Sequence, residues 1–171
     1  QTQVAEDVVN VITKAYPEGV HQAASDGRFP MRIAIQSHCS VGVICNLLET
    51  SGSKVSFQSA SGSILHMAIK HKAHPAILQA LVNHSADALH TFDHFGMMPL
   101  HMALKDYPDP HVIQTLLNGF EDASGMKCYG IYPLQTAMDK ELPNEIISLL
   151  AQAHPYSDAL KARAIVRLSQ K

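Results

Sequence analysis

Tryptophan is absent from this sequence of 171 residues, and aromatic and charged residues make up only 6% and 16% of it. The net charge is −2, so no overall electrostatic field favours nucleic acid or an anionic membrane as a partner. No apolar run approaches the roughly 20 residues that cross a bilayer, so we expect no direct membrane insertion. With 46% hydrophobic residues, the composition predicts one globular domain with a substantial core.

Cysteine is scarce as well. The three copies, Cys39, Cys45 and Cys128, lack the even number and paired spacing of a disulfide framework. We expect reduced thiols packed as small hydrophobic groups, and therefore an intracellular, cytosol-like reducing compartment. The chain starts at Gln1 inside an apolar helical pattern, which is typical of a fragment or a processed product. Because the targeting signal of a longer protein would not be part of such a fragment, localisation to an organelle remains an alternative.

A nine-residue pattern recurs four times, at intervals of 34 or 35 residues. The copies are GRFPMRIAI, SGSILHMAI, GMMPLHMAL and GIYPLQTAM, which begin at Gly27, Ser61, Gly96 and Gly130. A period of this length is the signature of a repeat array. Each copy has an anchor followed four positions later by alanine: Pro30 and Ala34, Ile64 and Ala68, Pro99 and Ala103, and Pro133 and Ala137.

Each repeat predicts two short helices joined by a turn. In the third copy, Pro99 suits the first helical position, because its φ is already helical and its missing N–H would have no helical partner there. Leu100, Ala103 and Leu104 then share one helical face. Asp109, which precedes a proline, is a good N-cap for the second helix. The predicted fold is all-α with about ten short helices, and the Gly- and Ser-rich connections predict protruding loops.

This layout resembles the ankyrin repeat, whose signature is T-P-L-H-x-A within about 33 residues. The resemblance covers residues 7–155 and is strongest over Asp93–Ala103, DHFGMMPLHMA. The turns AYPEG and AHPYS also resemble those of ankyrin proteins of algae and other protists. The resemblance implies a helix-turn-helix solenoid whose repeat-motif residues are Pro30, Ala34, Leu65, His66, Ala68, Pro99, Leu100, His101, Ala103, Pro133, Leu134 and Ala137.

The repeats depart from the signature at the threonine, proline and histidine positions, and Ile64 replaces the proline in the second repeat. Phe29, Ser63, Met98 and Tyr132 replace the threonine, so that only Ser63 keeps a hydroxyl for capping. Arg32 and Gln135 replace the histidine in the first and last repeats, where the middle two keep His66 and His101.

We expect one ankyrin-type domain over residues 1–171. The half repeat 1–22 keeps only a second helix, and four repeats follow at 23–56, 57–91, 92–125 and 126–155. Residues 156–171 depart from the repeat, with Leu160, Ala164, Ile165 and Leu168 on one stripe. We expect this segment to form a helix that caps the last repeat, as solenoids require, and a connector into a further domain is the alternative.

No residues with the pattern of a catalytic, cofactor or metal site stand out. The resemblance implies that His66 and His101 hydrogen-bond loop backbone and tie one repeat to the next. The closest histidine cluster, HTFDH at His90–His94, falls in an expected loop without a neighbouring Cys-x-x-Cys or glutamate, so we expect no metal. The glycine patterns that bind phosphates are also missing, so we expect a non-catalytic protein without a cofactor.

A partner surface is instead expected on the loop tips and at the ends of the first helices, where the resemblance places protein contacts. Large apolar residues there are typical of an interface, so we expect another protein as partner and a place for the chain in a larger assembly. A regulatory segment of a larger enzyme or channel is the alternative. The candidate contact residues are Phe57, Lys70, His71, Phe92, His94, Phe95, Met97, Lys105, Asp106, Met126, Tyr129, Ile131 and Lys140.

Overall fold

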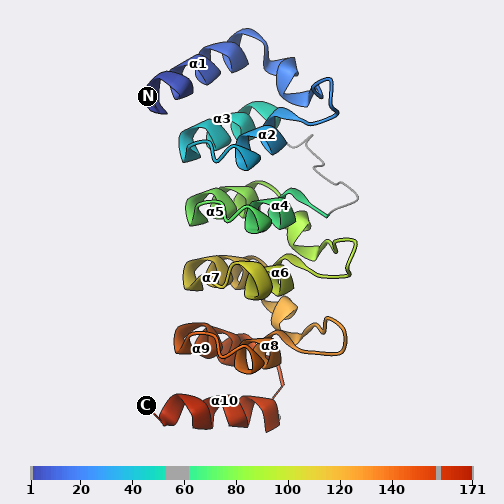
Figure 1. Ribbon diagram of the computed structural model, residues 1–171, viewed down its shortest axis with the longest axis vertical. Helices are drawn as coiled ribbons and strands as arrows, with labels where there is room; N and C mark the ends of the chain where they lie inside the picture. Colours follow the sequence, from blue (N-terminus) through green and yellow to red (C-terminus); the bar gives the residue numbers. More distant parts are fainter. Residues whose placement is uncertain (1, 53–61, 157–158, 171) are drawn as a thin grey trace.

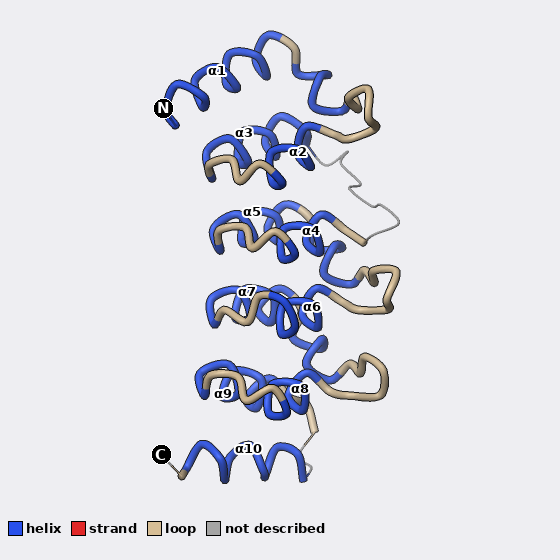
Figure 2. The backbone as a smooth tube through the Cα atoms, viewed as in Figure 1, coloured by secondary structure: helices blue, strands red, loops and turns tan. Residues whose placement is uncertain are grey.

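The computed structural model describes residues 2–52, 62–156 and 159–170, and the described parts form ten α-helices stacked in a ladder (Figure 1). The helices run in two columns, and the loops between successive units project from one side of the stack (Figure 2). The described residues contain no β-strand, only an isolated bridge between Cys128 and Ile131. The all-α solenoid predicted from the sequence is therefore confirmed.

The four complete units each contribute one helix to each column. The first helices are α2 (Pro30–Gln36), α4 (Ile64–Lys70), α6 (Pro99–Asp106) and α8 (Pro133–Asp139). The second helices are α3 (Val41–Ser51), α5 (Pro75–His84), α7 (Pro110–Gly119) and α9 (Asn144–Ala153). The stack begins with α1 (Thr2–Ala15) and ends with α10 (Ala159–Ser169). Among the described residues, short 3₁₀ helices precede the loops at η1 (Pro17–His21), η3 (Ala86–His90) and η4 (Glu121–Gly125).

Helix starts follow the sequence signals. Proline occupies the first turn of three of the four first helices, and Ile64 starts the remaining one. The Asp109 carboxylate caps α7 by accepting hydrogen bonds from the backbone N–H groups of His111 and Val112, at 2.9 and 3.1 Å. The first helices are short because the chain must turn back at once to bring the second helix against the first.

The repeated alanines lie at the closest contacts of the stack. Ala68, Ala103 and Ala137 are fully buried, and Ala34 is nearly so. Their small side chains let the first helices of successive units approach each other, and α4 contacts α6 as α6 contacts α8. The core is continuous along the stack, so each unit is stabilised mainly by its neighbours.

The N-terminal helix α1 lies in the same column as the second helices of the units and packs on α3 (Figure 1). Its inner side is polar: Thr13 Oγ1 donates to Asn46 Oδ1 at 2.7 Å, and Asn46 Nδ2 donates to Asn10 Oδ1 at 2.6 Å. The opposite side is apolar and exposed, with Val8, Val11 and Ile12 more than half accessible.

The C-terminal helix α10 packs on α8 and α9 and covers the end of the core. Ala164 is fully buried in this contact, and Arg167 Nη1 donates to the Met138 carbonyl at 3.0 Å. Leu160 and Leu168 also pack against the core, but Ile165 is 54% exposed. The expectation that Ile165 belongs to the buried stripe was wrong, because Arg167 takes part in the contact while Ile165 and its neighbour Val166 point to solvent.

Candidate partner-binding groove

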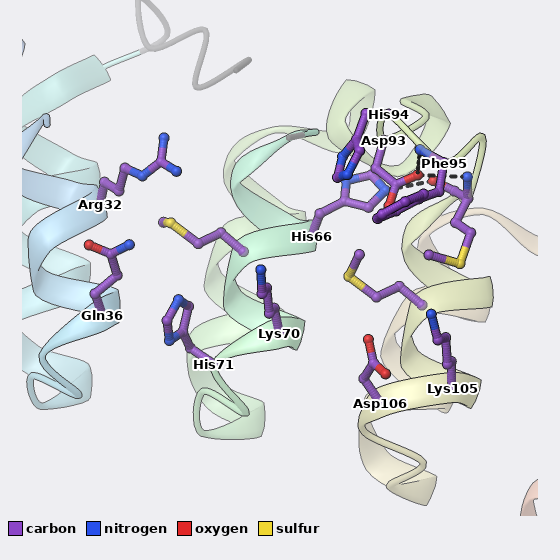
Figure 3. A pocket seen from close by; sticks show the side chains of 13 residues that line it. Arg32, Gln36, His66, Lys70, His71, Asp93, His94, Phe95, Lys105 and Asp106 are labelled. Carbon is purple, nitrogen blue, oxygen red and sulfur yellow. Dashed lines mark hydrogen bonds between the residues drawn. The ribbon is translucent and has the colours of Figure 1, made fainter. Parts of the chain in front are cut away.

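A groove of about 290 Å³ lies across the first helices α2, α4 and α6, on the face that the resemblance to ankyrin repeats implies is concave (Figure 3). Three successive units contribute to it, together with the loop that precedes α6. We call it the concave groove. Its lining consists of Arg32, Gln36, His66, Met67, Lys70, His71, Asp93, His94, Phe95, Met97, Met102, Lys105 and Asp106.

Cationic side chains stand along the rim of the concave groove. Lys70 and Lys105 are exposed at the last turns of α4 and α6, and their ammonium groups make no ion pair or hydrogen bond in the described parts of the chain. The pKa of His71 is lowered, first by partial burial and then by the neighbouring charges of His38, Lys70 and Arg32. A histidine that resists protonation in this way indicates positive potential at this end of the groove.

The floor of the groove is apolar and rich in sulfur. Met67 is half-buried and Met102 is nearly buried, and both lie one turn before the rim lysines of their helices. The Phe95 ring borders the floor and is 54% exposed. Flexible methionine side chains beside an aromatic ring adapt readily to an apolar side chain from a partner.

Asp93 fixes the loop that carries Phe95. Its Oδ1 accepts hydrogen bonds from the backbone N–H groups of Phe95 and Met97, at 2.9 and 2.8 Å (Figure 3). Gly96 has a φ of +71°, which favours glycine at this turn. The His94 and Phe95 rings pack against each other with centroids 3.8 Å apart and their planes tilted by 43°. The loop therefore presents Phe95 on a hydrogen-bonded frame, which reduces the entropy lost on binding.

The placement of Met97 corrects one sequence expectation. We expected it to be exposed beside Phe92 and Phe95, but it is only 7% accessible. Its backbone N–H is held by Asp93, and its carbonyl lies 2.9 Å from His66 Nε2, so the residue is drawn inward between successive units. Met97 belongs to the loop frame and, like the equally buried Met102, lines the groove without standing out as an exposed tip.

His66 and His101 lie between units, where the resemblance to ankyrin repeats had placed them. His66 Nδ1 accepts from the Ser63 backbone N–H at 3.1 Å, and its Nε2 therefore carries the proton and donates to the Met97 carbonyl. His101 Nε2 lies 3.0 Å from the Met126 carbonyl in the same way. Burial lowers the pKa of both imidazoles, so they are neutral near pH 7.

Exposed apolar side chains continue from the groove onto the loop tips, and we call this set the loop ridge. The loops before α6 and α8 are joined, because the Tyr129 hydroxyl donates to the Phe95 carbonyl and the Cys128 thiol lies 3.7 Å from the Gly96 carbonyl. The accessible fractions range from 37% to 76%. The loop ridge consists of Phe92, Phe95, Met126, Tyr129 and Ile131.

Two other candidate contact residues have particular placements. Lys140 is exposed, but its Nζ donates to the Lys105 carbonyl of the preceding unit at 3.3 Å. Phe57 lies outside the described residues.

The imidazole rings of His90 and His94 pack on different phenylalanine rings. His90 packs on Phe120 with centroids 3.9 Å apart, while His94 packs on Phe95. Within residues 2–52, 62–156 and 159–170, no three His, Cys, Asp or Glu side chains are grouped to hold a metal ion. None of the helices described is long and apolar enough to cross a membrane.

Arg32, Met67 and Met102 line the groove but were not among the contact residues predicted from the sequence. A signal for the two methionines was present: each stands three positions before a rim lysine, and residues three apart share a helical face. Arg32 was considered only as a replacement for the motif histidine. Its position in the first turn of α2 nonetheless brings it to the groove.

Stacked helix pairs with projecting loops define a helical-repeat solenoid. Residues 65–117, from the start of α4 to the end of α7, match the family model described as ankyrin repeats (many copies). The match identifies this segment as ankyrin repeats, and the same two-helix unit recurs on both sides of it. No curated protein matches the sequence. Ankyrin repeats are generally protein–protein interaction modules and are typically non-catalytic.

Proposed function

We propose that this chain is a non-catalytic protein-interaction module that binds a partner protein through the concave groove and the loop ridge. The observation that carries the proposal is the pair of phenylalanines on the loop before α6, each 54% exposed, of which Phe95 lines a groove with an apolar floor. Aromatic and methionine side chains ringed by charge are typical anchors of protein interfaces. The hydrogen bonds of Asp93 and Tyr129 hold this surface in place before a partner arrives.

The test replaces both exposed rings, with Phe92→Ser and Phe95→Ser in one variant. We expect capture of the partner from native extract to be lost, while the melting temperature stays nearly unchanged, because both side chains are more than half accessible. The matched control is Ile165→Ser with Val166→Ser on α10, which removes two apolar side chains of similar exposure far along the stack. A folded double-phenylalanine variant that still captures its partner would contradict the proposed surface.

A further inference from the structure

The charges along the concave groove are unbalanced. Its exposed and half-exposed cations, Arg32, Lys70 and Lys105, come one from each of three successive first helices. Against them stand Asp106, which is exposed, and Asp93, which is buried with one oxygen held by two backbone N–H groups. No ion pair between these groups forms within the described residues, where the salt bridge found is Arg28–Asp26, outside the groove. The groove therefore has an excess of available positive charge.

The spacing of these cations matches an extended peptide. Packed helices lie about 8–10 Å apart, so the rim lysines at the last turns of α4 and α6 lie at about that interval. Arg32 stands in the first turn of α2, about one turn nearer the helix start than these lysines. An extended chain rises about 3.3 Å per residue, so acidic residues three positions apart reach neighbouring units. Between the cations lies the apolar floor of Met67 and Met102, bordered by Phe95.

We propose that the concave groove binds an extended acidic segment of another protein, with an apolar side chain seated among Met67, Met102 and Phe95 and flanking carboxylates paired with Arg32, Lys70 and Lys105. The inference rests on the proposed function and specifies the chemistry of the partner. The excess positive charge selects acidic over basic segments, and the methionine floor supplies the apolar contact that neutral polar segments lack.

The experiment selects binders from a phage-displayed library of random 12-residue peptides on the purified chain. We expect enriched peptides to carry a net negative charge around a large apolar residue. The variant Lys70→Glu with Lys105→Glu should lose this preference or select basic peptides, and Lys70→Gln with Lys105→Gln should bind the enriched acidic peptides about tenfold more weakly. The matched control, Lys14→Glu with Arg163→Glu, reverses two exposed cations on the terminal helices and should leave the selection unchanged.

Each other outcome overturns the inference. Failure to enrich any peptide, enrichment of peptides without acidic bias, or an acidic bias that persists in the folded lysine variants would each show that these cations do not select the partner. Enrichment of basic peptides would contradict the acidic partner but not the use of the groove for binding. The proposed function itself is judged separately, by partner capture with the Phe92 and Phe95 variant.

Discussion

His66 and His101 occupy the same position in successive units, but their Nδ1 atoms have different surroundings. His66 Nδ1 lies 3.1 Å from the Ser63 backbone N–H and 3.0 Å from the Ser63 hydroxyl. His101 Nδ1 is buried without a hydrogen-bond partner, and Met98 stands where the preceding unit has Ser63. A buried acceptor without a partner costs free energy, so the third unit gives up stability that the second retains.

A hydroxyl at position 98 should recover part of this loss. We compare Met98→Thr with Met98→Val, which have similar shapes, so that the cavity left by methionine affects both variants alike. The threonine variant should be more stable by about 1 kcal/mol, because its hydroxyl can bond His101 Nδ1 as Ser63 bonds His66. Urea denaturation measures both variants, and a threonine variant less stable than the valine variant would show that the hydroxyl finds no partner.

Both buried histidines should make the stability of the fold depend on pH. Their pKa is lowered from 6.5 by burial, so below that value the unfolded chain binds protons that the folded chain does not. The free energy of unfolding should therefore be fully retained above about pH 7 and should fall as the pH drops through 6.5. We expect His66→Gln with His101→Gln, which copies Gln135 of the fourth unit, to flatten this dependence in denaturation curves at pH 7.5 and 5.5. An unchanged slope would assign the effect to other groups.

At the scale of the helix, the contact between α4, α6 and α8 depends on the small side chain of alanine. Ala103 is fully buried on α6, so Ala103→Leu should destabilise the fold by about 1–3 kcal/mol through overpacking. Ala162→Leu on the exposed side of α10 is the control and should change stability by less than about 0.5 kcal/mol. Equal denaturation midpoints for the two variants would contradict a tight contact at Ala103.

Helix positions could be predicted from the sequence more fully than loop geometry. Proline and Asp109 act locally, through φ and a side-chain acceptor, so they mark helix starts without knowledge of the fold. The turn after Cys128 has positive φ at both Tyr129 and Gly130, and only the glycine signals this in sequence. The burial of Met97 could not be predicted either, because it depends on a hydrogen bond with His66 of the preceding unit.

The candidate site was predicted in outline. The rim lysines and loop aromatics were predicted from the repeat register together with the resemblance to ankyrin repeats, which implies protein contacts at loop tips and helix ends. Arg32, Met67 and Met102 join them only when three units stack, and the concave groove is a property of that stacking. The helical spacing within one unit places each methionine on the face of its rim lysine, but no single unit shows that the faces of three units form one groove.

At the scale of the whole molecule, α1 differs from the second helices of the units because its outer apolar side chains are exposed. Ile12 is 57% exposed, whereas Leu47, 35 residues later at the matching position of α3, is 6% exposed. Leu47→Gln should therefore cost about 3 kcal/mol, and Ile12→Gln should change stability by less than about 0.5 kcal/mol. Chemical denaturation at low protein concentration measures both variants. A comparable loss from Ile12→Gln would mean that the outer side of α1 is covered in solution.

The bonds made between units by the histidine of the repeat motif are unevenly distributed along the stack. His66 links the second unit to the third and His101 links the third to the fourth, whereas Arg32 and Gln135 stand at this position in the end units. In a chain where each unit touches only its neighbours, such differences create a gradient of local opening. Amide hydrogens of α5 and α7 should therefore exchange with deuterium last, and those of α1 and α10 first. Local opening would then start at both ends and reach last the middle units, whose helices α4 and α6 bear most of the concave groove, so most of this surface persists while the termini fray.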